Sequence, residues 1–199
     1  MGWKVMNILL PLVLLCLWRL QEGADACKCL VRHPQEVFCQ ADVVIRAEVL
    51  GGKTDSDNQL IQYIIKQTKM FKGPKRNFDA IYTASSSAAC GVTLKKGTMY
   101  LLMGTLESNG LLRITGCDFF QPWSSVSAGQ KSLLRRYEKG CDCKIVRCTS
   151  VPCGISNPAE CLWTQFLPIK MASNEQTQNF ACLKKGYGYC AWSRASGSP

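Results

Sequence analysis

The cysteines constrain this chain more than any other feature. The 199 residues include 13 cysteines, and seven of them lie within residues 141–190. Twelve of the cysteines follow residue 26. An even number at high density is typical of an exported protein that is cross-linked in an oxidising compartment. We therefore expect six disulfides, although the spacing cannot say which cysteines pair. The twelve cysteines that follow residue 26 are Cys27, Cys29, Cys39, Cys90, Cys117, Cys141, Cys143, Cys148, Cys153, Cys161, Cys182 and Cys190.

The first 26 residues form a segment with a pattern of its own. Lys4 precedes an apolar run from Ile8 to Trp18, and the segment ends in the small-x-small tripeptide Ala24-Asp25-Ala26. These are the parts of a secretory signal peptide. The alternative is a membrane anchor, but the run is shorter than the roughly 20 apolar residues that span a bilayer. We expect cleavage after Ala26, secretion into the extracellular space or matrix, and no membrane span.

Cysteine spacing also predicts how the rest of the chain is divided. Residues 27–142 carry few cysteines for their length and can build an apolar core. Residues 143–199 carry many, and a segment this short depends on cross-links for stability. We expect an N-terminal domain over residues 27–142 and a small disulfide-rich domain over residues 143–199.

The N-terminal domain has the pattern of a mainly β structure. Five segments are rich in β-branched and aromatic residues, which favours strands; they are residues 43–50, 59–71, 78–84, 99–106 and 111–117. Residues 51–58 (GGKTDSDN) resemble a turn between the first two. Five strands at this spacing predict a small closed or partly closed barrel.

Two helices are expected beside the barrel, and loops and short strands beyond Cys141. In residues 125–140, Leu133, Leu134 and Tyr137 can share one helical face, and Ser127 is a suitable N-cap. Residues 33–42 are a second candidate, with Pro34 suited to a first helical turn.

The sequence argues against an enzyme. The chain has one histidine, His33, with no nucleophile motif near it. We expect His33 to make a structural hydrogen bond. The dense cysteines of CDCKIVRCTSVPC could also suggest a zinc site, but zinc needs reduced thiolates, so an exported chain favours disulfides.

Charge leaves two interpretations open. The chain has 24 Lys and Arg against 14 Asp and Glu, a formal net charge of +10. A basic secreted protein can bind heparin-like sulfated glycans, whereas secretion makes nucleic acid an unsuitable partner. The other interpretation is a solvated basic face. Basic residues cluster at Lys66, Lys69, Lys72, Lys75 and Arg76, and again at Lys131, Arg135, Arg136 and Lys139.

Cys27 would become the first residue after cleavage. A free α-amino group has a pKa of about 7.7–8.0, so its neutral form is accessible near physiological pH. The amine and the carbonyl oxygen of one residue can chelate a metal that has an open position, as a catalytic zinc has. Disulfides at Cys27 and Cys29 would order a chain end that is otherwise mobile. The alternative is a plain disulfide-bonded terminus.

Taken together, these residues resemble a known family. The segments CKCLVRHPQEVFCQADVVIRAEV, IKQTKMFKG, IYTASSSAACGV, CDF, PW and CLW are similar to those of the tissue inhibitors of metalloproteinases, across the whole chain after residue 26. The resemblance implies an OB-like five-stranded barrel of the netrin-related type. It also implies the disulfides Cys27–Cys90, Cys29–Cys117, Cys39–Cys141, Cys143–Cys190, Cys148–Cys153 and Cys161–Cys182.

The resemblance implies a function as well: one-to-one inhibition of matrix metalloproteinases by a monomer. Cys27 would bind the zinc of the target protease, and the inhibitor would need no cofactor of its own. The residues expected to contact the protease are Cys27, Lys28, Cys29, Leu30, Val31, Ser86, Ser87, Ala88, Ala89 and Cys90.

One of these residues departs from the family pattern. Lys28 stands where other members carry Ser or Thr, at the position that enters the specificity pocket of the protease. Burying an unpaired ammonium costs free energy, although a long side chain can carry its charge to water. The alternative function is therefore a matrix-, glycan- or receptor-binding module whose inhibition is weakened by Lys28.

Overall fold

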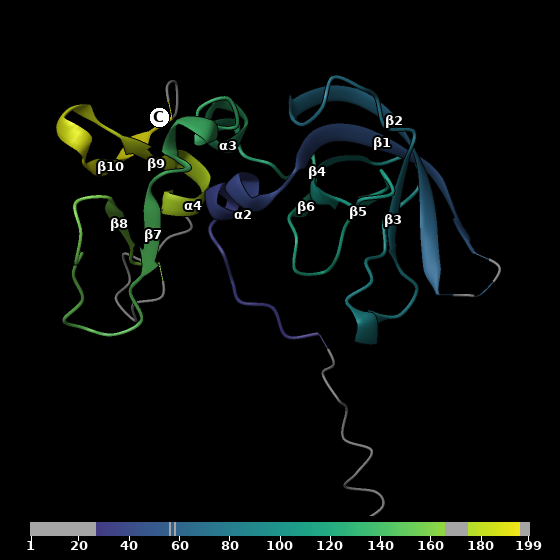
Figure 1. Ribbon diagram of the computed structural model, residues 1–199, viewed down its shortest axis with the longest axis horizontal. Helices are drawn as coiled ribbons and strands as arrows, with labels where there is room; N and C mark the ends of the chain where they lie inside the picture. The colour runs from purple at the N-terminus through teal and green to yellow at the C-terminus, as the bar shows by residue number, and fades with distance from the viewer. Residues whose placement is uncertain (1–26, 56, 58, 166–174, 196–199) are drawn as a thin grey trace, which may run out of the picture.

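A six-stranded sheet that curls into a barrel forms the larger part of the structure (Figure 1). In this computed structural model the described residues are 27–55, 57, 59–165 and 175–195. The expected signal peptide lies outside them. Within these ranges, no helix is long and apolar enough to cross a membrane.

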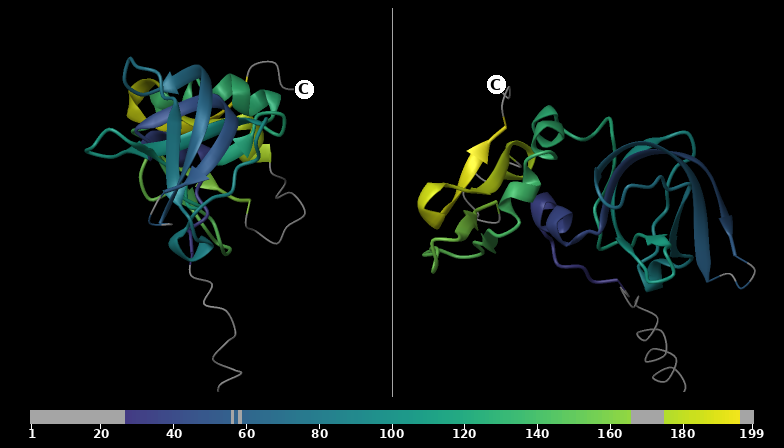
Figure 2. Two further views of the ribbon diagram at one scale, coloured as in Figure 1. Left: turned by 90° about the vertical axis from the view of Figure 1, so that its right-hand side faces the viewer. Right: turned by 45° about the horizontal axis from the view of Figure 1, so that its top comes forward.

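The barrel is closed by a strand that pairs on both sides. β1 (Val43–Thr54) pairs antiparallel with β2 (Leu60–Lys72) and with β4 (Met99–Leu106). β3 (Ala80–Ala84) pairs with β2, and β5 (Leu112–Arg113) joins β3 to β4. These five strands form a ring (Figure 2, right). The prediction of a mainly β fold with a five-stranded barrel is confirmed.

Two strands end at other residues than the sequence predicts, and one strand was not expected. Residues 51–54 continue β1 because Gly52 has no side chain: a Cβ there would lie 2.9 Å from the ring of Tyr63 on β2. The last expected strand shortens to Leu112–Arg113, since Asp118 Oδ2 accepts hydrogen bonds from Thr115 N and Oγ1, both at 2.9 Å, and turns the chain. A sixth strand, β6 (Phe120–Pro122), pairs with β4 and was not expected.

Alternation along the strands fills the barrel. On β1, Val43, Ile45, Ala47 and Val49 are all fully buried and face the interior. Side chains at alternate positions of a strand point to the same face of a sheet. The barrel core also contains Tyr63, Ile65, Phe78, Ile81, Val92, Leu94, Tyr100, Leu102, Leu112 and Ile114.

Both expected helices are present and begin at capping boxes. α2 (Pro34–Gln40) has His33 as its N-cap, with Pro34 at the first position. α3 (Ala128–Leu133) begins at Ser127, as predicted, and its Ser127 and Gln130 cap each other. α3 is shorter than expected: the helix ends at Leu133, and the chain then makes a 3₁₀ turn, η2 (Tyr137–Gly140).

The remaining residues form short elements joined by disulfides. Their strands are β7 (Lys144–Arg147), which pairs with β8 (Glu160–Trp163), and β9 (Phe180–Lys184), which pairs with β10 (Cys190–Arg194). α4 (Glu175–Asn179) and the 3₁₀ turn η3 (Gly186–Gly188) complete them. The division at residue 142 stays a prediction.

A second apolar cluster lies outside the barrel and joins the two parts. Phe38 of α2 packs in it with Leu133 and with Ala181 and Leu183 of β9. Residues far apart in the sequence therefore share one core. Its other buried members are Val37, Ala41, Val44, Leu101, Met103, Val126, Leu134, Tyr137 and Ala195.

Candidate functional site: the disulfide-tied N-terminal segment

Two disulfides attach the segment after residue 26 to the barrel. Cys27 is bonded to Cys90, which follows β3, and Cys29 is bonded to Cys117, which follows β5. The Cα atoms of each pair lie 5.1 Å apart. Residues 27 and 29 are thus anchored at two points only two residues apart, which leaves the segment between them little freedom.

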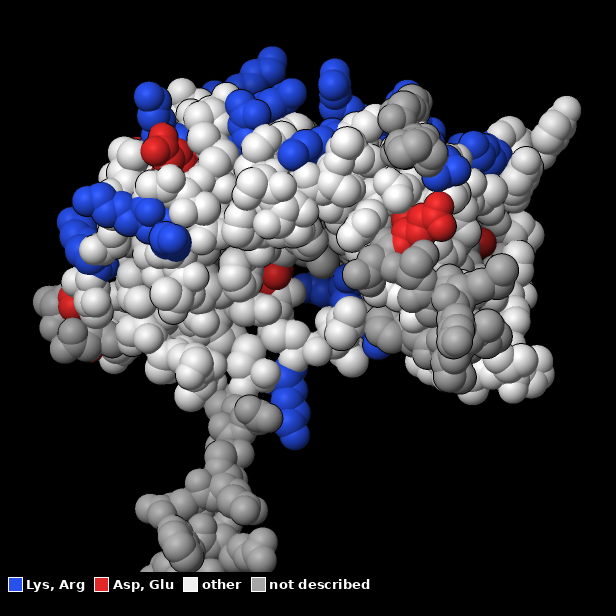
Figure 3. Space-filling view, turned by 180° about the vertical axis from the view of Figure 1, so that it is seen from behind, with Lys and Arg blue, Asp and Glu red and all other residues white. Residues whose placement is uncertain are grey.

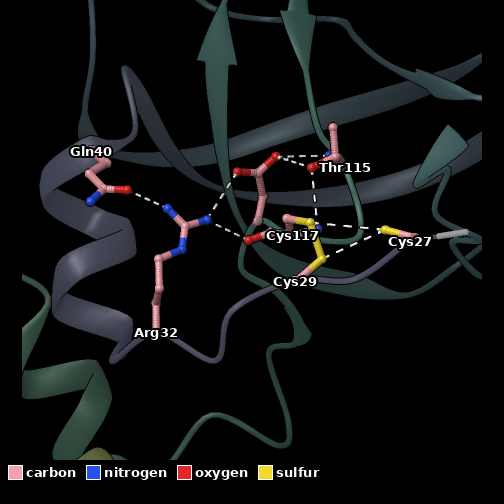
Figure 4. Close-up of polar contacts among 7 residues, drawn as sticks. Cys27, Cys29, Arg32, Gln40, Thr115 and Cys117 are labelled. Carbon is pink, nitrogen blue, oxygen red and sulfur yellow. Dashed lines mark hydrogen bonds and ion pairs between the residues drawn. A yellow bond between two sulfur atoms is a disulfide. The ribbon is translucent and has the colours of Figure 1, made fainter. Parts of the chain in front are cut away.

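The two disulfides also touch each other. Cys27 Sγ lies 3.6 Å from Cys29 Sγ and 3.9 Å from Cys117 Sγ (Figure 4). Gly116 fits against this cluster, because a Cβ there would already contact Cys27 Sγ at 3.7 Å. The four sulfurs form a single packed unit beneath the segment.

The partner segment, residues 86–90, is a short turn with its own cap. The 3₁₀ turn η1 (Ser87–Ala89) is capped by Ser86, whose Oγ accepts a hydrogen bond from Ala89 N at 3.2 Å. Cys90 ends the turn in a left-handed conformation with φ of 58°. Gly91 then passes so close to β3 that a Cβ would lie 2.0 Å from the carbonyl oxygen of Ala84. This close approach directs Cys90 toward Cys27.

The residues expected to contact a protease are exposed in both segments. Leu30 and Val31 retain 79% and 56% of their accessible surface. Lys28, Cys29 and residues 86–89 are exposed as well, whereas Cys27 and Cys90 are half-buried. The Cys27–Cys90 disulfide joins the two segments of the expected contact set, and we define these ten residues as the ridge: residues 27–31 and 86–90.

Arg32 follows Val31 and fixes the end of the ridge. Its guanidinium donates to the carbonyl oxygen of Cys117 at 2.6 Å and to Gln40 Oε1, and lies 4.0 Å from Asp118 (Figure 4). A planar guanidinium suits several acceptors at once. The sequence signal was the CDF motif that contains Asp118, but only the fold places it beside Arg32.

His33 and Gln35 attach the same segment to the C-terminal part. The imidazole of His33 is fully buried, with Trp163 and Trp192 each 5.3 Å from it between ring centroids. Its Nδ1 accepts a hydrogen bond from Gln35 N at 3.2 Å, and its Nε2 lies 3.3 Å from the carbonyl oxygen of Gln176. Burial lowers the pKa of His33 from its ordinary 6.5 to about 4, against the hydrogen bond to Gln176, which raises it. The expected structural hydrogen bond of His33 is confirmed.

The side-chain amide of Gln35 completes this attachment. Its Nε2 donates to the carbonyl oxygens of Gly140, at 3.1 Å, and Cys182, at 2.7 Å. Its Oε1 accepts from Cys182 N at 2.8 Å. The ridge is therefore continued by residues that are held on one side by the barrel and on the other by β9.

The structure contains six disulfides, and the pairs are those that the resemblance implies. Two groups of sulfurs lie close enough together to hold a metal ion: Cys27, Cys29, Cys90 and Cys117, and also Cys143, Cys182 and Cys190. Every member is disulfide-bonded and so presents no thiolate, the form of cysteine that binds zinc.

The basic clusters of the sequence separate in the structure. Lys72 Nζ donates to the carbonyl oxygens of Phe38 and Cys39 at the end of α2, at 3.1 and 2.8 Å. Arg76 donates to the carbonyl oxygen of Gly110, and Arg136 to that of Arg194. These three cations have structural roles, so the two sequence clusters are not two uniform binding patches.

Comparison with known proteins agrees with this architecture. The family model described as "Tissue inhibitor of metalloproteinase" matches residues 25–192. Among curated relatives, Metalloproteinase inhibitor 2 of Cavia porcellus and of Homo sapiens are each 48% identical over 210 aligned residues, covering 100% of this chain and 96% of the relative. The protein of the same name from Gallus gallus is 44% identical over 209 residues, covering 100% and 94%. The chain belongs to the tissue inhibitor of metalloproteinase family.

Proposed function

We propose that this protein is a secreted inhibitor of zinc metalloendopeptidases, with matrix metalloproteinases as its first targets. It acts as a monomer that binds one protease molecule and catalyses no reaction of its own. The relatives it matches are named as metalloproteinase inhibitors. The observation that carries the proposal is the ridge, in which Cys27 is held by the Cys27–Cys90 disulfide beside the exposed residues 86–89.

The proposed mechanism depends on cleavage after Ala26. Cleavage frees the α-amine of Cys27, and this amine and the Cys27 carbonyl oxygen then bind the catalytic zinc of the protease. They occupy the position that a water molecule holds in catalytic zinc sites. The zinc is the target's, and the inhibitor holds no cofactor of its own.

Rigidity is what the fold adds to this chemistry. A chain end that must become ordered on binding loses affinity through conformational entropy. Here Cys27 and Cys29 are both cross-linked, and their sulfurs pack together at 3.6 Å. The segment is ordered before it meets a protease, so most of this entropic cost falls on folding rather than on binding.

The test is inhibition of purified matrix metalloproteinase catalytic domains by the secreted protein, with Cys27 confirmed as its first residue by mass spectrometry. A variant with one alanine added before Cys27 should lose inhibition, because its α-amine is displaced by one residue from the zinc. Its six disulfides and its melting temperature should match those of the parent protein.

The matched control uses the same molecule. An aminopeptidase that removes the added alanine should restore inhibition fully. If the extended protein inhibits as well as the parent, zinc binding through the Cys27 amine is wrong, whatever the inhibition constant of the parent protein.

A further inference from the structure

Lys28 is a basic side chain on a segment that is anchored on both sides. It is exposed between Cys27 and Cys29, and both of these cysteines are tied to the barrel by disulfides. None of the ion pairs among the described residues involves Lys28. At the foot of the molecule in Figure 3, where the described chain meets the grey residues, basic atoms project into solvent with no acidic atoms beside them. The ammonium of Lys28 is therefore available to a carboxylate of a partner.

The backbone around Lys28 is also available for pairing with another chain. Residues 27–33 form no helix or strand and lead from the barrel to α2 (Figure 1). Within the described part of the chain, no hydrogen bond uses a backbone N–H or carbonyl group of residues 28–31. A peptide of this kind can add to a strand of a partner, where main-chain hydrogen bonds supply affinity and side-chain pockets supply specificity.

The charge of Lys28 indicates which class of partner fits. A lysine that enters an apolar pocket loses its hydration without compensation. Trypsin-like serine proteases instead hold a carboxylate in the pocket that receives the residue before the scissile bond. Leu30 and Val31, which are 79% and 56% exposed, follow the Lys28–Cys29 bond and offer apolar side chains to the protease surface beyond it. The segment thus presents a lysine before one peptide bond and apolar contacts after it.

We propose that the Lys28–Cys29 peptide bond is a reactive site through which the protein inhibits trypsin-like serine proteases. The serine hydroxyl of the protease attacks the carbonyl carbon of Lys28, the bond to the Cys29 nitrogen breaks, and the histidine of the protease transfers the serine proton to that nitrogen. The products are an ester between Lys28 and the serine and a free α-amine at Cys29. The reverse step restores the peptide bond and the free serine, and it needs no other reactant.

The two disulfides favour inhibition over digestion. After the bond breaks, each new chain end is still tied to the barrel by its own disulfide. The Sγ atoms of Cys27 and Cys29 lie 3.6 Å apart, so the released amine of Cys29 stays near the ester at the high effective concentration of an intramolecular group. The ends also gain little conformational entropy on separation. Resynthesis of the bond therefore competes with hydrolysis, and the protease remains occupied.

The experiment measures inhibition of trypsin by the intact secreted protein, with hydrolysis of a small chromogenic lysine substrate as the readout. Lys28→Gln should raise the inhibition constant at least about a hundredfold, because it removes the charge that pairs with a buried carboxylate. Lys28→Arg keeps the charge and should inhibit within about tenfold of the parent protein. The control Lys53→Gln removes the same charge at an exposed position of β1 and should change the constant less than about twofold.

A second measurement separates an inhibitor from a substrate. A catalytic amount of trypsin should slowly produce a mixture in which the Lys28–Cys29 bond is intact or cleaved, and the same mixture should form from the purified cleaved protein. Reduction and mass spectrometry identify the new chain end at Cys29. The proposal is overturned if trypsin keeps its full activity, if Lys28→Gln inhibits like the parent protein, or if cleavage after Lys28 runs to completion.

One variant keeps this proposal distinct from the proposed inhibition of metalloproteinases. An alanine added before Cys27 displaces the α-amine, but it lies on the far side of Cys27 from Lys28. The extended protein should therefore inhibit trypsin like the parent protein while it loses inhibition of matrix metalloproteinases. Failure to inhibit trypsin contradicts the reactive site alone, whereas trypsin inhibition without metalloproteinase inhibition by the parent protein contradicts the proposed function alone.

Discussion

In the proposed contact with a protease, Lys28 stands where the family resemblance leads us to expect Ser or Thr. It is exposed between two disulfide-bonded cysteines, and under the proposed mechanism its side chain enters the specificity pocket of the protease. A charge that enters an apolar pocket loses its hydration. Under the proposed function we therefore expect Lys28 to control target range rather than folding.

Lys28→Thr should strengthen inhibition of proteases with apolar pockets. We expect an inhibition constant at least about tenfold lower, since relief of a desolvated charge by about 1.4 kcal/mol corresponds to that factor. Lys53→Thr, at an exposed position of β1, is the control and should have no effect. An unchanged constant for Lys28→Thr would mean that the ammonium already reaches water or an acidic group.

His33 makes stability depend on pH in a defined window. Its folded-state pKa is about 4 against an ordinary 6.5, so below pH 6.5 the unfolded chain binds a proton that the folded protein does not. Stability is therefore complete above pH 6.5, falls by about 3 kcal/mol between pH 6.5 and 4, and levels off below that.

Urea unfolding between pH 7 and 4 measures this effect. His33 is the only histidine of the chain, which makes His33→Asn a clean control, because asparagine can still cap α2. That variant should be less stable at pH 7 and should lose less stability on acidification. Parallel curves for the two proteins would show that His33 is not the titrating group.

At the scale of elements, the ridge exists because a terminal segment and a turn are cross-linked. Cys27–Cys90 and Cys29–Cys117 are accessible, whereas Cys161 and Cys182 are 3% and 0% exposed. Access controls the rate at which a thiolate attacks a disulfide. A thiol freed at Cys27 also lies 3.6 Å from the sulfur of Cys29, so the two ridge disulfides are chemically connected.

Mild reduction should therefore abolish inhibition before the protein unfolds. Alkylation and mass spectrometry should find the ridge cysteines modified before Cys161 and Cys182, while circular dichroism remains close to that of the native protein. The reason is that residues 27–31 lose their anchors and regain the mobility of a chain end. Inhibition that survives complete alkylation of Cys27 and Cys90 would contradict the role of the disulfide.

At the scale of the whole molecule, α2 joins two parts that the cysteine spacing separates. Gln35 makes three hydrogen bonds to Gly140 and Cys182, and Phe38 packs with Leu133 and Leu183. The barrel and the C-terminal elements therefore share a core through a helix that directly follows the ridge.

Gln35→Ala should lower stability by about 3 kcal/mol, because buried backbone groups of Gly140 and Cys182 would lose their partners. Gln59→Ala is the control, at an exposed position, and should lower it by less than about 0.5 kcal/mol. Urea unfolding measures both. Equal stabilities for the two variants would show that water replaces the lost partners.

The sequence by itself determined the fold class, the two helix starts and the family. Strand periodicity reflects burial on one face, and the helix-start signals at Ser127 and Pro34 are local, so both can be predicted without tertiary information. The positions of the β bulge at Thr68 and of the short strand β6 could not be predicted, because each is set by pairing with another strand of the sheet. The end of β5 is set by a local turn in which Asp118 accepts from Thr115, and sequence reasoning missed it.

Part of the candidate site could also be predicted from the sequence, and part of it depends on the tertiary structure. The CKC start and the segment before Cys90 identify the residues of the ridge, because their chemistry is local. Only the tertiary structure brings Arg32 to Asp118 and His33 to Trp163, since the two members of each pair lie far apart in the sequence. Local patterns specify which groups are available; packing decides which of them meet, and so which surfaces can bind.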